Sequence, residues 1–335
     1  MWTREQHSCE KLYNDTVTRS PNGRIVVKLP FKDDPACLGE SYTTALRRFS
    51  AQERRLQRSP NLRTQYVEFM DEYERLGHMQ PGSTTTKLRV VFDAFCQTTT
   101  QTSFNDIQMV GPIIQSELVV LLLQFRLHRF ALTAEIVKMY RQVLVSEEHR
   151  MFQYILWRSS PNQEIQTFQL NTVTYGMEAA PYLAVRSLHH LADQHASQFV
   201  VGANVVKSSF YVDDLLCGDD SRTDLSRVKH EVTELLKLGG LDLAKWHSNH
   251  KRFRGEHSVK DFNLDTSITS TLVLTWDQTH DNFLFSFQSR QPTNSRVTKR
   301  TILSTASSLF DPLGLLAPVI VTAKILLQEM WLLKL

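Results

Sequence analysis

The sequence predicts an α+β fold in which helices cover one face of an antiparallel sheet. Short β-prone runs and amphipathic helical runs follow one another in the order β-α-β-α-β-β-α-β across the central region. Two of the strands are joined by a tight acidic turn, which requires antiparallel pairing. A helical segment precedes this region instead of alternating with its strands. Together these features are typical of an α+β layer and not of an alternating parallel α/β sheet.

The first elements are two predicted helices. Residues 44–58 have helical periodicity, and a second helix restarts at Pro60, carries its apolar residues on one stripe and stops at Gly77. Residues 87–93 then predict a strand with cations at its start, and residues 117–126 predict a buried helix.

An acidic residue follows the next strand. A predicted strand over residues 129–135 ends on Glu135 and runs directly into a predicted helix over residues 136–143. This order is a recurrent way to present a ligand at the end of a strand. Further on, residues 168–173 predict a strand and residues 176–190 predict a helix.

The most informative segment is an acidic hairpin. Residues 208–212 and 215–217 are β-prone, while Asp213 and Asp214 supply turn chemistry between them. Both carboxylates are therefore expected at an exposed, rigid tip. Carboxylate pairs can hold two metal ions about 3.5–4 Å apart, an arrangement used in phosphoryl transfer. On its own the pair is weak evidence, because Asp-Asp in a turn is usually a solvated loop.

A helix and a basic segment follow the hairpin. Residues 219–221 predict the N-cap of a helix with one apolar face, which Gly239-Gly240 closes. Between Asp281 and Asp311 the sequence has no acidic residue and carries four cations, Arg290, Arg296, Lys299 and Arg300. Such a segment suits phosphate groups. A solvated linker with incidental charge is the open alternative.

The composition is that of an ordinary globular protein with one large domain or two to three subdomains. Of 335 residues, 41% are hydrophobic and 22% charged. The 38 basic and 35 acidic residues are too balanced to indicate a nucleic-acid partner by themselves. The cysteines form no Cys-x-x-Cys or Cys/His pattern, so neither a disulfide framework nor a zinc site is predicted.

The apolar segments of the sequence bear on the cellular compartment of the protein. Met1 is followed by polar and charged residues instead of the apolar core of a secretory signal. The most apolar stretch, residues 313–333, is interrupted by proline and by charged and polar side chains, so no membrane span is expected. We expect a cytoplasmic protein, in an intracellular particle or in the nucleus, and not a secreted one.

Five segments, taken together and in order, resemble the reverse transcriptase of Bel-Pao long-terminal-repeat retrotransposons, and the resemblance covers nearly the whole chain. They are residues 83–94 (STTTKLRVVFDA), 171–176 (NTVTYG), 211–214 (YVDD), 239–246 (GGLDLAKW) and 309–318 (LFDPLGLLAP). The resemblance implies a right-hand polymerase fold with fingers, a palm with an antiparallel sheet, and a partial thumb. It also implies a primer on an RNA or DNA template, deoxynucleoside triphosphates and two Mg²⁺ ions, with Mn²⁺ as the alternative.

The resemblance also implies domain boundaries. An N-terminal helical extension would occupy residues 1–79, the fingers 80–130, the palm 131–286 and a truncated thumb 287–335. The protease, RNase H and integrase of the full polyprotein are expected to be absent, as in a fragment. Other parts of that polyprotein are expected partners.

Residues that match the family motifs take the family's roles. Glu135, Asp213 and Asp214 would be the catalytic, metal-binding carboxylates. Lys87 and Arg89 would hold the triphosphate of the incoming nucleotide, a task that suits a point charge and a planar fork. Ordinary strand-edge charges are the alternative for these two cations.

Further positions match the nucleotide and primer sites. Tyr140 would exclude a 2′-hydroxyl by bulk, or would simply pack in the core. Gly176 would let the backbone approach the templating base pair. Lys245 would contact the pyrophosphate or protonate it as leaving group, or would be a surface lysine. Primer and template contacts are expected from Tyr211, Trp276, Arg296, Lys299 and Arg300.

Three positions depart from the family pattern. Glu135 replaces an aspartate, residues 80–82 stand where the family has an additional fingers strand, and Val273 replaces a glycine of the primer-gripping hairpin. The extra methylene of glutamate moves the carboxylate by roughly 1 Å, and a misplacement of that size can cost on the order of 10²-fold in rate. These departures suggest a decaying or spliced copy.

Three functions therefore remain open. The chain is an RNA-directed DNA polymerase, or a catalytically impaired remnant that still binds nucleic acid, or a structural protein unrelated to polymerases. Salt-sensitive binding to template and primer without synthesis would indicate the second. The third would require the ordered motifs to be a coincidence.

Overall fold

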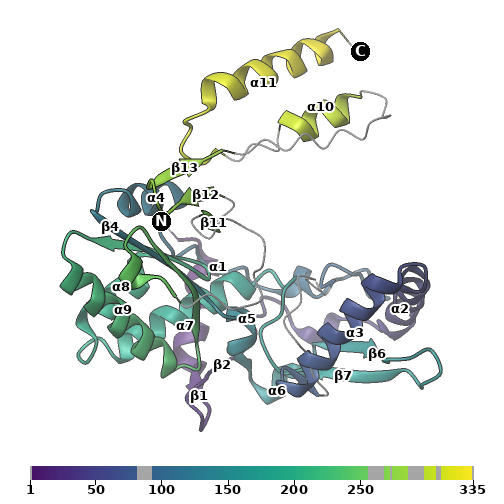
Figure 1. Ribbon diagram of the computed structural model, residues 1–335. Coiled ribbons are helices and arrows are strands. Elements are labelled where there is room, and N and C mark those ends of the chain that lie inside the picture. Colours follow the sequence, from purple (N-terminus) through teal and green to yellow (C-terminus); the bar gives the residue numbers. More distant parts are fainter. Residues whose placement is uncertain are drawn as a thin grey trace. The chain divides into compact units, whose positions relative to one another are not determined.

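The computed structural model describes residues 2–80, 93–255, 268–271, 274–285, 298–306 and 311–333, without the side chains of residues 80, 268–271 and 306. The described chain is mixed α+β (Figure 1), as the sequence predicts. It divides into two compact units, each built from separate stretches of sequence. Unit 1 comprises Met1–Gln115, Val137–Lys207 and Glu231–Asp242, and unit 2 comprises Ser116–Ile136, Ser208–His230 and Leu243–Leu335. The expected palm, residues 131–286, contributes to both units.

The centre of unit 2 is a four-stranded antiparallel sheet in the order β10-β4-β9-β8. Its strands are β4 (Phe130–Ile136), β8 (Phe210–Tyr211), β9 (Asp214–Asp219) and β10 (Leu243–Ser248). The apolar residues predicted for these strands, such as Leu132 and Leu216, are buried. The predicted strand before Glu135 and the predicted hairpin are both present.

A helix and a second sheet complete the core of unit 2. Helix α4 (Leu118–Phe125) packs on β9, and a three-stranded antiparallel sheet is formed by β11 (Ile268–Thr271), β12 (Leu274–Asp277) and β13 (Asn282–Leu284). The shared core consists of Leu122, Phe125, Ala131, Leu216, Leu274 and Trp276. Only one face of α4 is buried, whereas the sequence predicted a buried helix.

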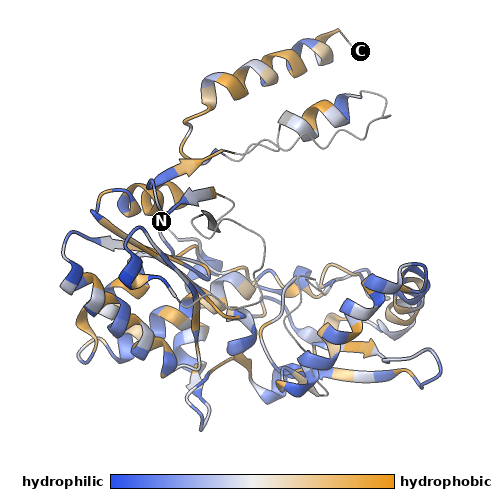
Figure 2. Cartoon of the chain, viewed as in Figure 1, coloured by the Kyte–Doolittle hydropathy of each residue, from blue (hydrophilic) through white to orange (hydrophobic). Residues whose placement is uncertain are grey.

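Two helices lie near the C-terminus of the chain. They are α10 (Lys299–Ala306) and α11 (Ala317–Leu332). Figure 2 shows apolar residues over most of α11, although its side chains are largely exposed. None of the helices in the described ranges is both long and apolar enough to cross a membrane.

Helix α9 (Arg222–Lys237) follows the hairpin, as predicted, and spans the sequence boundary between the two units. The Ser221 hydroxyl accepts a hydrogen bond from the backbone N–H of Asp224 at 3.3 Å, which is the expected N-cap. Gly240 has a φ of +70°, which ends the helix in the left-handed conformation that glycine adopts readily.

One part of unit 1 is built on helices α1 (Arg4–Thr16) and α7 (Ala180–Gln194). A small sheet of β1 (Thr18–Arg19), β2 (Ile25–Val27) and β5 (Leu144–Val145) belongs to the same part. Its core contains Tyr13, Ile25, Leu29, Val145, Tyr182 and Leu183.

A second part of unit 1 contains the two helices that the sequence predicted. They are α2 (Tyr42–Gln57) and α3 (Pro60–Arg75), which pack on each other, and α2 also packs on the sheet of β3 (Met79–Gln80), β7 (Gln166–Leu170) and β6 (Tyr154–Trp157) (Figure 1). The core here consists of Phe69, Met70, Tyr73, Met79, Trp157, Phe168 and Leu170.

Several elements of unit 1 differ from the sequence prediction. The helix expected over residues 136–143 is reduced to α5 (Met139–Gln142), because Lys138 has a left-handed φ of +53° that an α-helix does not accommodate. Helices α6 (Glu147–Arg150) and α8 (Val200–Ser208) had no predicted counterpart. Most of the strand expected over residues 87–93 lies outside the described residues.

Candidate functional site

The acidic hairpin of unit 2 turns at Val212 and Asp213. Phe210 pairs with Leu215 and Tyr211 pairs with Asp214, so the turn has two residues. Val212 has a φ of +55°, in the left-handed region. Two-residue hairpin turns require a positive φ, which glycine supplies without strain, whereas a β-branched residue costs of order 1–3 kcal/mol. This strained turn holds Asp213 at the end of the hairpin.

The structure corrects the position of one carboxylate. The sequence placed Asp213 and Asp214 together at the tip, but Asp214 is the first residue of β9 and Val212 takes its place in the turn. Asp214 lies directly opposite Glu135 on β4. Residues opposite each other in an antiparallel pair project to the same face, with Cβ atoms about 4.5–5.5 Å apart. The carboxylates of Glu135 and Asp214 therefore share one face of the sheet.

The turn is also fastened to the end of β4. The backbone N–H of Ile136 donates a hydrogen bond to the carbonyl of Asp213 at 2.8 Å. This bond connects the residue after Glu135 with the first aspartate of the hairpin. The three acidic residues that the sequence singled out therefore lie at one edge of one sheet, which we call the acidic edge (Glu135, Asp213 and Asp214).

Lys245 reaches the acidic edge from the other neighbour of β4. Ala244 on β10 lies opposite Glu135, and the register shifts immediately afterwards, at a β-bulge where Lys245 has a φ of +53°. Bulges re-aim side chains. Here the Nζ of Lys245 donates to Oε2 of Glu135 at 2.6 Å. Both side chains are solvent-accessible, so the pair contributes about 0–1 kcal/mol to stability.

The side chains of the acidic edge are not arranged as a metal-binding group. Within the part of the chain that the structure describes, no set of three or more His, Cys, Asp or Glu side chains is arranged to hold a metal ion. Glu135 is instead occupied by the ammonium group of Lys245. The carboxylates are thus close in the sheet, but they are not gathered around a common point.

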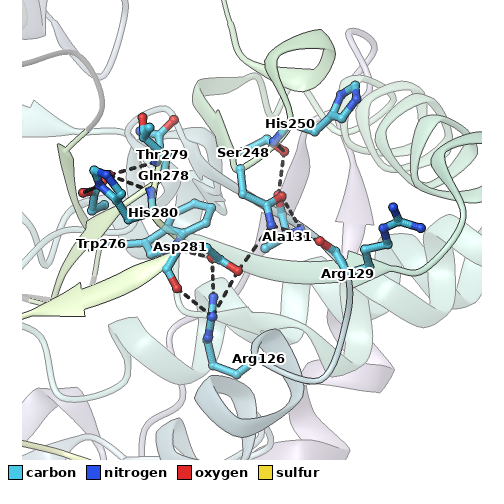
Figure 3. A network of polar contacts seen from close by, with 12 residues as sticks. Arg126, Arg129, Ala131, Ser248, His250, Trp276, Gln278, Thr279, His280 and Asp281 are labelled. Carbon is cyan, nitrogen blue, oxygen red and sulfur yellow. Dashed lines mark hydrogen bonds and ion pairs between the residues drawn. The ribbon is translucent and has the colours of Figure 1, made fainter.

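A polar network fixes the β12–β13 hairpin within unit 2 (Figure 3). The guanidinium of Arg126 donates to both carboxylate oxygens of Asp281 and to its backbone carbonyl. The same carboxylate accepts from the indole N–H of Trp276 at 2.9 Å and from the amide of Asn249 at 3.4 Å. Asn249 also accepts from the backbone N–H of Ala131 at 3.0 Å. One carboxylate therefore connects α4, β4 and the hairpin.

The burial of Trp276 bears on its expected primer contact. Its ring is 1% exposed and lies edge-on against Phe125, with 5.0 Å between ring centroids. A side chain so enclosed offers no face to a nucleic acid in this structure. Trp276 stabilises the hairpin through its hydrogen bond to Asp281. Its burial does not agree with the expected direct contact to the primer.

A second ion pair sits beside this network. Asp277 accepts a hydrogen bond from the backbone N–H of Thr279 at 2.8 Å, and its Oδ2 lies 2.6 Å from Nδ1 of His280 (Figure 3). The hydrogen bond with His280 lowers the pKa of Asp277, and the same bond raises the pKa of His280. His280 is exposed at the tip of the β12–β13 hairpin, whereas the side chain of Asp277 is only 13% exposed.

The remaining candidates fall in different places. Tyr211 is half-buried in β8, while Lys299 and Arg300 begin α10 with partly and fully exposed side chains. Tyr140 of unit 1 packs against the core and lies edge-on to Tyr175, at 4.6 Å between centroids. Lys87, Arg89 and Arg296 lie outside the described residues.

Gly176 of unit 1 occupies a conformation that requires glycine. Its φ is +101°, and its carbonyl accepts a hydrogen bond from the side chain of Asn105 at 2.9 Å. A residue with a Cβ would be strained in this conformation. The role of Gly176 beside the templating base pair stays a prediction.

Sequence reasoning did not identify Arg126, Asn249 or Asp281. Arg126 and Asp281 are separated by 155 positions, and neither belongs to a motif. No periodicity or spacing in the sequence indicates their contact.

Comparisons with known proteins give one family match. Residues 298–335 match a family model described as the Pao retrotransposon-like RNaseH-like domain. This segment contains α10 and α11 and lies outside the acidic edge. Its description names an RNaseH-like domain where the sequence analysis assigned a truncated thumb and expected no RNase H part. Among curated proteins no match was found.

Foamy-virus proteins are among the solved structures with a similar backbone. The protease-reverse transcriptase dRH in complex with double-stranded DNA has a TM-score of 0.46 and 13% identity, over 70% of this chain and 37% of that one. The protease-reverse transcriptase with an RNA/DNA hybrid has a TM-score of 0.43 and 13% identity, over 68% and 27%. The chain thus spans well under half the length of these proteins, and similarities of this size do not identify a function.

Proposed function

We propose that this chain is the reverse transcriptase region of a Bel-Pao retrotransposon polyprotein, acting at the acidic edge of unit 2. The observation that carries the proposal is the arrangement of three acidic residues at one end of one sheet. Glu135 lies opposite Asp214 across β4 and β9, and Asp213 sits next to them on a strained turn that Ile136 fastens to β4. Strained backbone of this kind clusters at functional sites.

The proposed reaction is nucleotidyl transfer. A primer 3′-hydroxyl attacks the α-phosphate of a deoxynucleoside triphosphate, the new O–P bond forms, and pyrophosphate leaves. Glu135, Asp213 and Asp214 would be the carboxylates that bind magnesium, or manganese in its place. In this structure the described side chains are not arranged as a metal-binding group.

The other candidate residues would contact the nucleotide, the primer or the template. Lys87 and Arg89 would hold the triphosphate, and Tyr140 and Gly176 would border the sugar and the templating pair. Lys245 would act on the pyrophosphate, for which it must leave Glu135. Contacts to the primer on its RNA or DNA template come from Tyr211, Arg296, Lys299 and Arg300, with Trp276 acting only through the hairpin that it supports.

A second candidate function is favoured by one specific contact. The ion pair between Lys245 and Glu135 neutralises one of the three carboxylates, and Glu135 is itself one methylene longer than the aspartate that the resemblance implies. A chain with this edge would bind template and primer without extending the primer. The alternative is therefore a catalytically impaired remnant of the same element.

Primer extension on a poly-rA template separates the two functions. The proposal predicts deoxynucleotide incorporation that depends on Mg²⁺. Incorporation by the Glu135→Asp chain but not by the natural chain would identify the impaired remnant. Salt-sensitive binding to template and primer, with no synthesis by either chain, would leave only nucleic-acid binding. Absence of both would contradict the proposal.

A further inference from the structure

Helix α2 in unit 1 carries a one-sided row of arginines. They are Arg47, Arg48, Arg54, Arg55 and Arg58, the last at the C-cap. At 3.6 residues per turn, or about 100° per residue, the five positions fall within an arc of about 120° on one side of the helix. The other positions in this arc are Thr44 and Ala51, so the arc contains no acid and no large apolar side chain. All five arginines are exposed.

Most of this charge is not neutralised within the chain. Arg48 pairs with Asp93 at 2.5 Å. The one acid of the helix, Glu53, is held by both ends of the Arg158 guanidinium at 2.8 and 2.7 Å. In the described part of the chain, the other four arginines of the row have no ion pair. Like charges one turn apart, as at Arg54 and Arg58, destabilise a helix. A bound polyanion would relieve this repulsion.

A large cavity lies directly beside the arginine row. It has a volume of about 1010 Å³, and Arg48 and Arg55 line it. Six aromatic side chains also line it: Phe49, Tyr66, Phe104, Phe152, Tyr154 and Tyr175. Five of the rings are half-buried, while Tyr154 on β6 is 55% exposed. Two arginines of the row and six aromatic rings therefore line the same concavity.

We propose that this cavity and the arginine row beside it bind a single strand of nucleic acid. Arginine suits phosphate because its planar guanidinium donates two parallel hydrogen bonds. Aromatic side chains stack on unpaired bases whatever their sequence. The row from Arg47 to Arg58 extends about 16 Å along the helix, at 1.5 Å per residue, which is long enough for several phosphates. The inference deepens the proposed function, and it rests on that function only for identifying the strand as the template.

A membrane surface fits this face less well. A helix that lies on a bilayer inserts large apolar side chains next to its basic ones. Here the arginine arc offers only Thr44 and Ala51 between the cations, and the apolar side of α2 is packed on α3 and β6. The aromatic rings line a concavity. A single strand is the polyanion that uses both features.

The charge test uses anisotropy of a fluorescein-labelled oligo-rA of roughly 15 nucleotides. The test variant is Arg54→Gln/Arg55→Gln/Arg58→Gln. The matched control is Arg4→Gln/Arg75→Gln/Arg222→Gln, which removes the same charge from exposed positions on α1, α3 and α9. For single strands the logarithm of affinity falls with the logarithm of salt by about 0.7 per phosphate contact, so losing three contacts should reduce the slope by about 2. The control should keep the natural slope.

The stacking test concerns Tyr154. Tyr154→Ala should weaken binding by about ten-fold, the loss of one stacked base, whereas Tyr154→Phe keeps the ring and should bind as the natural chain does. Unchanged circular dichroism would establish that each variant is folded. If the triple variant misfolds, Arg54→Gln or Arg58→Gln alone replaces it and should reduce the slope by about 0.7; if Tyr154→Ala misfolds, Tyr154→Leu replaces it. Equal slopes for the two arginine triples, or equal binding by Tyr154→Ala, would overturn the inference.

Two further measurements distinguish single-strand binding from catalysis at the acidic edge and from attachment to a membrane. Asp213→Asn, which alters only the acidic edge, should bind oligo-rA like the natural chain. If the natural chain binds oligo-rA but neither it nor any variant extends primers, the proposed function is wrong. The inference that the cavity binds a single strand is then retained. Sedimentation with phosphatidylserine vesicles gives the remaining outcome. Arginine-dependent binding to vesicles, without arginine-dependent binding to oligo-rA, would identify a membrane surface and overturn the inference.

Discussion

Replacing Asp281 tests whether one carboxylate holds the β12–β13 hairpin within unit 2. The carboxylate accepts hydrogen bonds from Arg126, Trp276 and Asn249. Asp281→Ala removes all of them. Asp281→Asn keeps the size and an acceptor but removes the charge, and asparagine tolerates the φ of +57° at this position better than alanine does.

The expected loss follows from the contacts. Hydrogen bonds to a charged group contribute about 1.5–3 kcal/mol, and a buried donor left without a partner costs about 1–3 kcal/mol. The donor at issue is the indole N–H of Trp276, whose side chain is 1% exposed. Adding about 1 kcal/mol for alanine in the left-handed region, we expect Asp281→Ala to lower the free energy of unfolding of unit 2 by about 4 kcal/mol. For Asp281→Asn we expect about 2 kcal/mol, because an acceptor remains.

Urea unfolding followed by tryptophan fluorescence measures these losses, and hydrogen exchange over residues 274–284 assigns them to the hairpin. A double-mutant cycle with Arg126→Met should give a coupling energy of about 1 kcal/mol or more with Asp281→Asn. Asp224→Asn, at an exposed carboxylate on α9 in unit 2, is the matched control. The reasoning is refuted if both Asp281 variants unfold within about 0.5 kcal/mol of the natural chain.

Three other changes give distinct readouts. Lys245→Ala should change the free energy of unfolding by less than about 1 kcal/mol, since its pair with Glu135 is exposed, yet it should slow primer extension; an unchanged rate would remove Lys245 from the reaction. Burial, with Arg141, Arg24 and Lys138 nearby, lowers the pKa of His78 to about 3, so the unfolded chain binds a proton from about pH 6.5 downward while the folded chain does not. Stability should therefore fall by about 2 kcal/mol from pH 7 to pH 5 through this residue, and urea unfolding of His78→Phe should lack that component. Gly176→Ala should destabilise unit 1 by about 1–3 kcal/mol because of its positive φ, and equal thermal stability would contradict the strain.

The elements that the sequence predicted well are those with local signals. The strand ending at Glu135 and the helices at residues 42–57 and 60–75 were visible because their periodicity and capping residues are local. The carboxylates were found because adjacent aspartates between β-prone runs are a local pattern too. Each of these signals lies within about twenty residues of sequence, which is the range over which periodicity carries information.

The remaining features depend on backbone conformations and on long-range contacts. The turn shifted by one residue because Val212 adopts a left-handed φ that its side chain disfavours. The helix after Glu135 was shortened by the left-handed Lys138. The contact between Arg126 and Asp281 joins residues 155 positions apart, so no local pattern could indicate it. The 3.6-residue period of α2 places the five arginines on one side of the helix. The inference that they bind a single strand depends on the cavity beside them, which no local pattern indicates.

The most direct test of the acidic edge is primer extension by the Glu135→Asp chain, with and without Asp213→Asn. In the Glu135→Asp chain the acid on β4 has the length that the resemblance implies, so this chain is the one expected to be most active. With Mg²⁺, a poly-rA template and a complementary primer, this chain should incorporate deoxynucleotides, and the added Asp213→Asn should abolish incorporation without reducing binding to template and primer. Equal incorporation by both chains, or none by either, would contradict the claim that the acidic edge is the catalytic centre.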